Sequence, residues 1–301
     1  MTSEMAVGYS VDRLSALARE MAPLMIGFCG MHALLYMATQ KVTGGWRVNG
    51  TSGAAAVAYN LTTLLFHVAS CSAGVRALGD GSMASLSGSM PLRLYGSSLT
   101  FMWLSSLTAG FEAYNTFVSV FVCPQGLALA AHHVVTLSLC FVSVAPYAHY
   151  YAFFFFGIAN LSSVPLAIFS LCDVLRSRYG RFEASYYFFR SLFGVSFLVV
   201  RCAVWPIMSA YFWVDTLAAF QDGTVHSTFA TCFLLASNVF LTGLQFMWGR
   251  KVVRGFLMLI SSLYVTHEPA GCAAKDNDRR RSGTSVMLRT LSTSLAVAMG
   301  K

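Results

Sequence analysis

The sequence is poor in charge. Only 11% of its 301 residues are Asp, Glu, Lys or Arg, whereas a soluble domain carries about a quarter charged residues. The charges are also unevenly placed, and several windows of about 20 residues hold none or one. This scarcity excludes a soluble globular chain. With 56% hydrophobic residues and a mean hydropathy of +0.62, the chain is predicted to be an all-α, polytopic transmembrane helical bundle.

Cysteine pairs at disulfide or metal-binding spacing are also missing. The eight cysteines are scattered along the chain, and no CxxC pattern occurs. This spacing favours neither a disulfide framework nor a zinc site. We therefore expect most of the cysteines to act as small packing residues.

Seven apolar segments are long enough to be membrane spans. They cover residues 21–39, 53–75, 97–121, 127–146, 150–174, 187–211 and 226–249. The very short connections on either side of the fourth span predict that the third, fourth and fifth spans are sequential antiparallel neighbours. This division makes residues 1–20 an N-terminal leader, residues 21–255 the transmembrane domain and residues 256–301 a basic, largely disordered tail.

The placement of basic residues predicts the orientation of the spans. Nine of the twenty Lys and Arg residues lie at or after Arg250, the loop at 175–186 carries three more, and the loop at 212–225 carries none. The C-terminus is therefore expected in the cytosol, and seven spans place the N-terminus on the other side. The sequon that begins at Asn49 then lies in the cytosol. Because so many of the basic residues lie at or after Arg250, a juxtamembrane basic segment is a simpler explanation of the net charge of +8 than a nucleic-acid partner.

Polar residues inside the spans are costly unless they have partners, and this marks them as candidate site residues. Glu112 is the only acid well inside a span, and Arg201 lies near the middle of the sixth. Because the two lie at similar depth, we predict that they pair directly or through a polar residue, either as a structural ion pair or in a cavity. The predicted polar lining of one cavity comprises Glu112, Asn115, Asn160, Ser163, Arg201 and Gln245.

Two adjacent histidines, His132 and His133, lie in the fourth span and are the candidate catalytic residues. Neighbours on a helix point about 100° apart, so both can border one cavity but only one can point to its centre. An imidazole there can act as a base or nucleophile or bind a head group, while a pair bonded to Asn and Ser would be structural. The chain has seven histidines, too few for the clusters of a membrane di-iron enzyme, and no metal site is predicted.

Five stretches, taken in order, resemble the TLC-domain family, which includes ceramide synthases and translocating-chain-associated membrane proteins. They are GFEAYN at 110–115, LALAAHHVVTL at 127–137, NLSSVPL at 160–166, FLVVRCAVWP at 197–206 and LQFMWGRKVVRG at 244–255. Together with the sequence around Trp46, the resemblance covers roughly residues 20–255. It implies a helical barrel around a lipid-accommodating cavity, in the endoplasmic reticulum or a related endomembrane.

The chain departs from the ceramide synthase pattern one helix after the histidine pair. Where those enzymes have an HDxxD pattern, the aligned positions are Ala159, Asn160 and Ser163, and Asn115 stands where the family has another aspartate. Acyl transfer needs a group that orients and charge-stabilises imidazole, as a carboxylate does. Glu112 could substitute only if the arginine of the sixth span leaves it free.

These features predict a divergent TLC-type membrane protein that binds lipid or acyl chains in membrane-lipid homeostasis. The alternative is an acyl-CoA-dependent lipid acyltransferase of the ceramide type, with His132 or His133 as base or transient acyl carrier, acyl-CoA as co-substrate and no other cofactor. A seven-span receptor or channel is a third option, against which the short connections count. Membrane lipids and acyl chains are the expected partners, and a homo-oligomer is compatible with the sequence.

Overall fold

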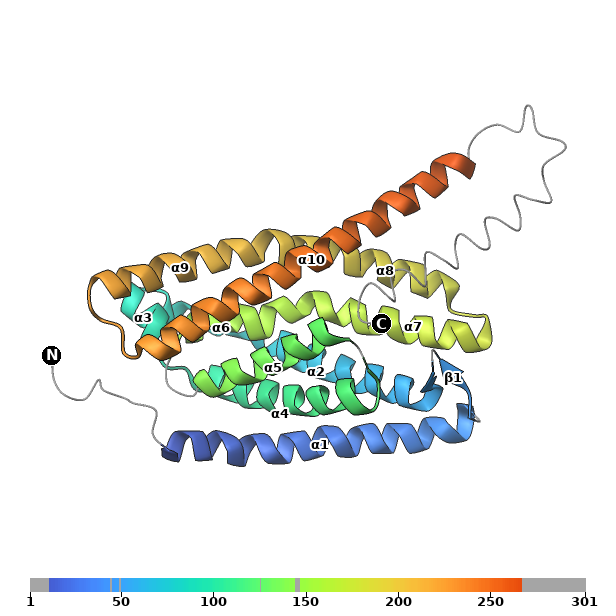
Figure 1. The fold of residues 1–301 in the computed structure, drawn as a ribbon, viewed down its shortest axis with the longest axis horizontal. Helices are drawn as coiled ribbons and strands as arrows, with labels where there is room; N and C mark the ends of the chain where they lie inside the picture. Colours follow the sequence, from blue (N-terminus) through green and yellow to red (C-terminus); the bar gives the residue numbers. More distant parts are fainter. Residues whose placement is uncertain (1–10, 44, 49, 125, 144–146, 267–301) are drawn as a thin grey trace.

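The computed structural model describes residues 11–43, 45–48, 50–124, 126–143 and 147–266, which form an elongated all-α bundle (Figure 1). Its seven antiparallel rods correspond to the seven predicted spans. The first four are α1 (Val11–Thr43), α2 (Gly53–Gly79), α4 (Leu99–Phe121) and α5 (Leu127–Val142). Rod five consists of α6 (His149–Ala152), η3 (Phe153–Gly157), η4 (Ile158–Ser162) and α7 (Ser163–Tyr179). Rod six consists of α8 (Glu183–Phe197), η5 (Leu198–Val204) and α9 (Trp205–Gln221), and α10 (Thr228–Thr266) is the seventh rod.

The lengths of the rods differ from the predicted spans at both ends of the chain. The first helix begins at Val11, inside the predicted leader, and the last continues to Thr266, inside the predicted tail. The rest of that tail, from residue 267, lies outside the described residues. Five helices are long and apolar enough to cross a membrane. They do not include α5, which has 16 residues, or α4, which carries buried polar side chains.

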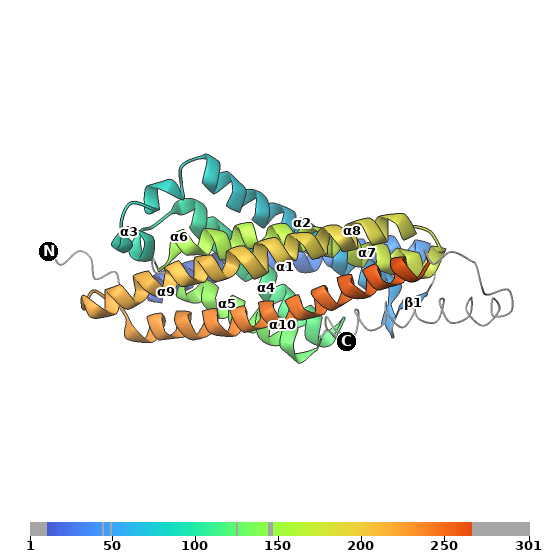
Figure 2. The same cartoon turned by 90° about the horizontal axis from the view of Figure 1, so that it is seen from above.

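Two small elements that the sequence did not predict lie at opposite ends of the bundle (Figures 1 and 2). A hairpin of β1 (Arg47–Val48) and β2 (Thr51–Ser52) joins the first two rods. The turn η2 (Ala84–Leu86) and the helix α3 (Met90–Tyr95) lie between α2 and α4.

The helix α3 is held against rod six by a two-pronged ion pair. Arg93 donates from Nε and Nη2 to the two carboxylate oxygens of Asp215, at 2.6 and 2.7 Å. The Tyr151 hydroxyl donates to the same carboxylate. Asp215 was predicted to lie in a loop at 212–225, but it lies within α9, which runs to Gln221. Arg93 and Tyr151 give the carboxylate the partners that its burial in this helix requires.

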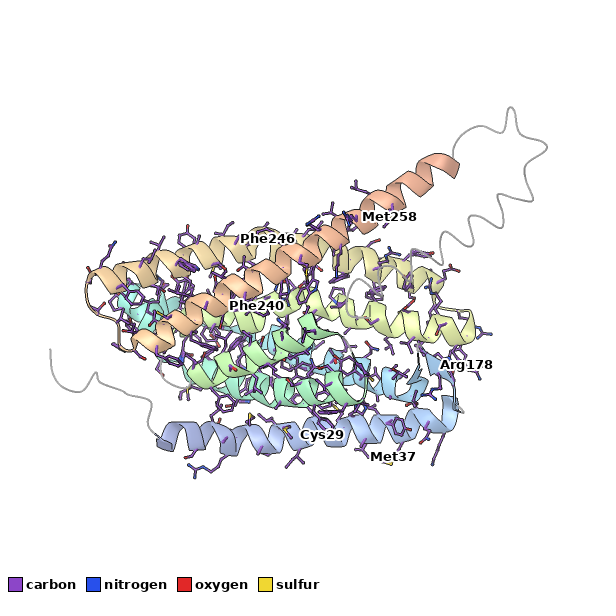
Figure 3. The ribbon with its side chains drawn as sticks, in the orientation of Figure 1. Cys29, Met37, Arg178, Phe240, Phe246 and Met258 are labelled. Atoms are coloured by element: carbon purple, nitrogen blue, oxygen red, sulfur yellow. The ribbon has the colours of Figure 1, made fainter. Side chains whose placement is uncertain are left out.

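Six of the rods form a closed ring, and α1 lies outside it. Successive neighbours around the ring are α2, α4, α5, α10, rod six and rod five, which packs back on α2, while α1 contacts α2 and α4. The helix α5 packs on α4 as predicted, but its other main neighbour is α10 and not rod five. Just before rod five, the backbone N–H of Ala148 donates to the carbonyl of Leu94 in α3. Apolar side chains such as Met37 and Phe246 cover the outside of α1 and α10 (Figure 3).

Rod five meets α2 at a pair of glycines. A Cβ atom on Gly74 would lie 2.6 Å from the backbone nitrogen of Ile158, and one on Gly157 would lie 2.7 Å from the Cα of Gly74. Gly74 therefore marks a point of close helix packing. Because backbone faces backbone, neither helix has a side chain that can move aside.

We expect Gly74→Ala to destabilise the protein. Overpacking costs about 1–3 kcal/mol, which exceeds the gain of about 1 kcal/mol that alanine gives in a helix. Gly30→Ala in α1 is the matched control, because a Cβ there meets nothing within 4 Å. Thermal unfolding in detergent should show a lower midpoint for Gly74→Ala only. Equal midpoints for the two variants would contradict the close contact.

Candidate functional site

A cavity lies inside the ring, and all six ring rods contribute to its wall. Its empty volume is about 810 Å³, including a part open to solvent. One lining residue from each rod, in ring order, is Phe66, Glu112, His132, Leu241, Trp205 and Tyr151. The outer helix α1 supplies none of the described lining residues.

The polar part of this wall is built around a hydrogen bond between α4 and α5. His133 Nδ1 lies 2.7 Å from Glu112 Oε2, and the two side chains are only 8% and 7% exposed. Asn115 lies one turn after Glu112, on the same face of α4. Its Nδ2 is 3.1 Å from His133 Nε2, while its Oδ1 accepts a hydrogen bond from the Tyr59 hydroxyl at 2.8 Å. The same amide nitrogen lies 3.2 Å from His133 Nδ1, so Glu112 and Asn115 together hold the imidazole in place.

The predicted pair between Glu112 and Arg201 is wrong. Arg201 Nε donates to Ser162 Oγ and Arg201 Nη2 to Ser163 Oγ, both at 3.0 Å. Glu112 instead binds His133, so the condition for it to act as the missing carboxylate is met. Glu112 and Arg201 both border the cavity, but their partners differ: His133 for the carboxylate and the two serines for the guanidinium.

Arg201 reaches the serines from a π-helical segment. It lies in η5, and a second π-helical segment, η3, lies in rod five on the same cavity. Single π-helical turns inside α-helices are frequent at functional sites. The unusual backbone turns Arg201 inwards, where it also lies beside the Trp205 ring, 5.9 Å from its centroid.

The two adjacent histidines have different surroundings. His132 borders the cavity, whereas His133 lies behind it on Glu112. This division agrees with the angle of about 100° between helical neighbours. Within the described part of the chain, the buried Nδ1 of His132 has no hydrogen-bond partner. Its ring meets those of Trp248 and His133 edge to face, with centroids 5.7 and 5.3 Å apart.

The other predicted lining residues divide between the cavity and the packing around it. Asn160 borders the cavity and donates to Ser70 Oγ at 3.0 Å. Asn115 and Ser163 are not among the lining residues but lie behind the wall. There Asn115 contacts His133, and Ser163 accepts a hydrogen bond from Arg201. Gln245 also lies outside the wall; it is buried, and its amide nitrogen and oxygen have no partner among the described residues.

Sequence reasoning missed the aromatic part of the wall. Tyr151, Phe155, Trp205 and Phe212 all border the cavity, although their apolar character gave no reason to separate them from lipid-facing residues. The signal that could have found Trp205 was its place one turn after Arg201, on the same helical face.

Three side chains of the kinds that bind metal ions also lie close together beside the cavity. One ligand atom each of Glu112, His132 and His133 lies within 4.8 Å of the others. The histidine count had predicted no metal site, and such a count does not detect a carboxylate supplied by another helix. Glu112 and the two histidines come from α4 and α5, which pack directly on each other.

Comparison with known proteins gives one family. The sequence model described as TLC domain matches residues 57–254. This range begins inside α2 and ends inside α10, so it spans the six ring rods and leaves α1 outside. No curated protein and no solved structure matches the chain. The match covers more than half of the chain. The protein is therefore a multi-pass integral membrane protein that belongs to the TLC-domain family.

Proposed function

We propose that the protein binds a lipid or an acyl chain inside the ring and acts in membrane-lipid homeostasis. The observation that carries this proposal is the amphipathic wall of the cavity. Glu112, His132 and Arg201 supply polar and charged groups, while aromatic side chains such as Phe155 and Phe212 supply apolar surface. An amphipathic ligand fits such a wall better than water or a fully polar solute does.

The charged and titratable groups of the wall lie near the middle of the ring, while the part towards α3 holds aromatic side chains and the uncharged polar residues Ser143 and Asn238. Arg201 and Phe212 both lie on rod six, and eleven residues of helix correspond to about 16 Å. Phe212 is near the α3 end, where Tyr151 also borders the cavity. This separation suits a head group near the middle of the ring and a hydrocarbon chain that extends towards α3.

Arg201 and His132 are suited to hold an oxygen-rich head group. A guanidinium has five N–H donors, and the two serine contacts of Arg201 use two of them. The remaining donors, together with the imidazole of His132, can contact carbonyl or phosphate oxygens. The family resemblance and the basic C-terminal segment support an endoplasmic reticulum or related endomembrane location, with the C-terminus in the cytosol.

We expect a bulky side chain in the cavity to displace the ligand. Leu241 lines the cavity and is 6% exposed, whereas Leu217 on α9 is 49% exposed. Leu241→Trp should therefore lower the lipid-bound fraction several-fold in native mass spectrometry, and the matched control Leu217→Trp should not. A wild-type protein that carries no lipid, or two variants that lose lipid equally, would refute binding in the cavity.

A second candidate function is acyl-CoA-dependent transfer to a lipid acceptor. The position of Glu112 favours it, because a carboxylate that borders the cavity and holds His133 beside His132 would take the place of the acids missing from the sequence pattern. His132, on the cavity side, would take the proton of an acceptor amine as the nitrogen attacks the thioester carbonyl. The C–S bond then breaks, and the leaving thiolate of coenzyme A recovers the proton.

An assay with acyl-CoA and a long-chain amine separates the two candidates. If transfer occurs, His132→Ala should reduce the rate by about 10²–10⁴-fold, the usual contribution of a general base. His226→Ala is the control, because this residue lies in the loop before α10, against Tyr95. Absence of product from lipid-loaded wild-type protein, or equal rates in both variants, would leave the binding function alone.

A further inference from the structure

We propose that Glu112, His132 and His133 form a binding site for a divalent transition-metal ion such as Zn²⁺, with one coordination position facing the cavity. This site goes beyond lipid binding and does not depend on it. Its three ligands come from two adjacent ring helices, and His132 and Glu112 also border the cavity.

The three ligand atoms lie close enough together for side-chain movements to bring them onto one tetrahedral ion. Zn²⁺ binds imidazole nitrogen at about 2.0–2.1 Å and carboxylate oxygen at about 2.0–2.2 Å, which places ligand atoms about 3.3 Å apart. His133 Nδ1 and Glu112 Oε2 are 2.7 Å apart, and no pair among the three ligand atoms exceeds 4.8 Å. Small side-chain movements would therefore bring all three onto one ion.

The unpartnered nitrogen of His132 is a second, independent observation. Its Nδ1 is buried and has no hydrogen-bond partner among the described residues. A buried polar atom without a partner is destabilising. A bound ion would satisfy this nitrogen, and it would replace the proton that His133 shares with Glu112.

The surroundings of His133 suit a metal ligand. A metal-bound imidazole commonly donates its other N–H to a neighbouring acceptor, which fixes the orientation of the ring. The side-chain amide of Asn115 lies 3.1 Å from His133 Nε2, and its oxygen takes this place if the amide is turned over. Tyr59, which contacts the other atom of the amide, can then act as the acceptor instead of the donor.

The charges around the site favour an anionic fourth ligand. A divalent ion with Glu112 as its only anionic ligand keeps a net positive charge, and Arg201 borders the same cavity. Three protein ligands with one free position are typical of catalytic and not of structural zinc sites. The fourth position would therefore take a hydroxide or a carboxylate or phosphate oxygen of a lipid.

The metal content of the full-length protein tests the proposal. The protein, purified in detergent and freed of any histidine tag, is equilibrated with Zn²⁺, dialysed and analysed by inductively coupled plasma mass spectrometry. We expect about one ion per chain, lost in Glu112→Gln and in His132→Ala. His67→Ala is the matched control, since this buried histidine of α2 is not in the donor set.

Cobalt substitution gives a readout that needs no variant. Wild-type protein with Co²⁺ should show the intense visible absorption of a tetrahedral site with nitrogen and oxygen ligands, and Zn²⁺ should abolish it by competition. Folded wild-type protein that binds no ion and shows no such absorption would overturn the proposal. One ion retained in both Glu112→Gln and His132→Ala would overturn it equally. Neither result bears on lipid binding, which is measured separately.

Discussion

The hydrogen bond between Glu112 and His133 is the interaction on which the rest of the site depends. A carboxylate among apolar helices is expensive to bury without a partner, and His133 provides that partner at 2.7 Å. Because of this bond, the His133 side chain lies behind the cavity wall. Its neighbour, His132, faces the cavity. The bond also leaves Arg201 to the two serines of rod five. One pairing thus accounts for the different surroundings of His132, His133 and Arg201.

The ring of six rods encloses these polar residues around one cavity. Six rods share the task of enclosing a cavity while α1 packs outside, and the family match covers the same six rods. The backbone contact at Gly74 and Gly157 holds rod five close to α2. Six residues before Gly157 in the same rod, Tyr151 donates to Asp215, which also pairs α9 with α3. These contacts hold the rods around the cavity, where Glu112, His132 and Arg201 supply the charged and titratable groups that a polar head group requires.

The sequence predicted depth along the bundle well and neighbours across it poorly. The scarcity of charge located all seven rods, because burial of charge in a membrane is costly regardless of the partner helix. Depth alone also suggested a Glu112–Arg201 pair and placed Gln245 on the cavity, yet the first is wrong and the second lies outside the lining. Whether two residues at one depth meet depends on the order of helices around the ring. That order, with α5 beside α10, follows from tertiary packing that no local pattern encodes.

A cryo-electron microscopy map of the full-length protein in lipid nanodiscs is the most direct test of a ring that encloses an amphipathic ligand around Glu112 and His133. We expect an elongated, non-protein density inside the ring, with its polar end at Arg201 and its apolar end towards Phe212. The carboxylate of Glu112 should lie within hydrogen-bond distance of His133. A ring collapsed onto its own side chains, with Glu112 paired to Arg201 and both histidines sealed between helices, would contradict this structure and the function proposed for it.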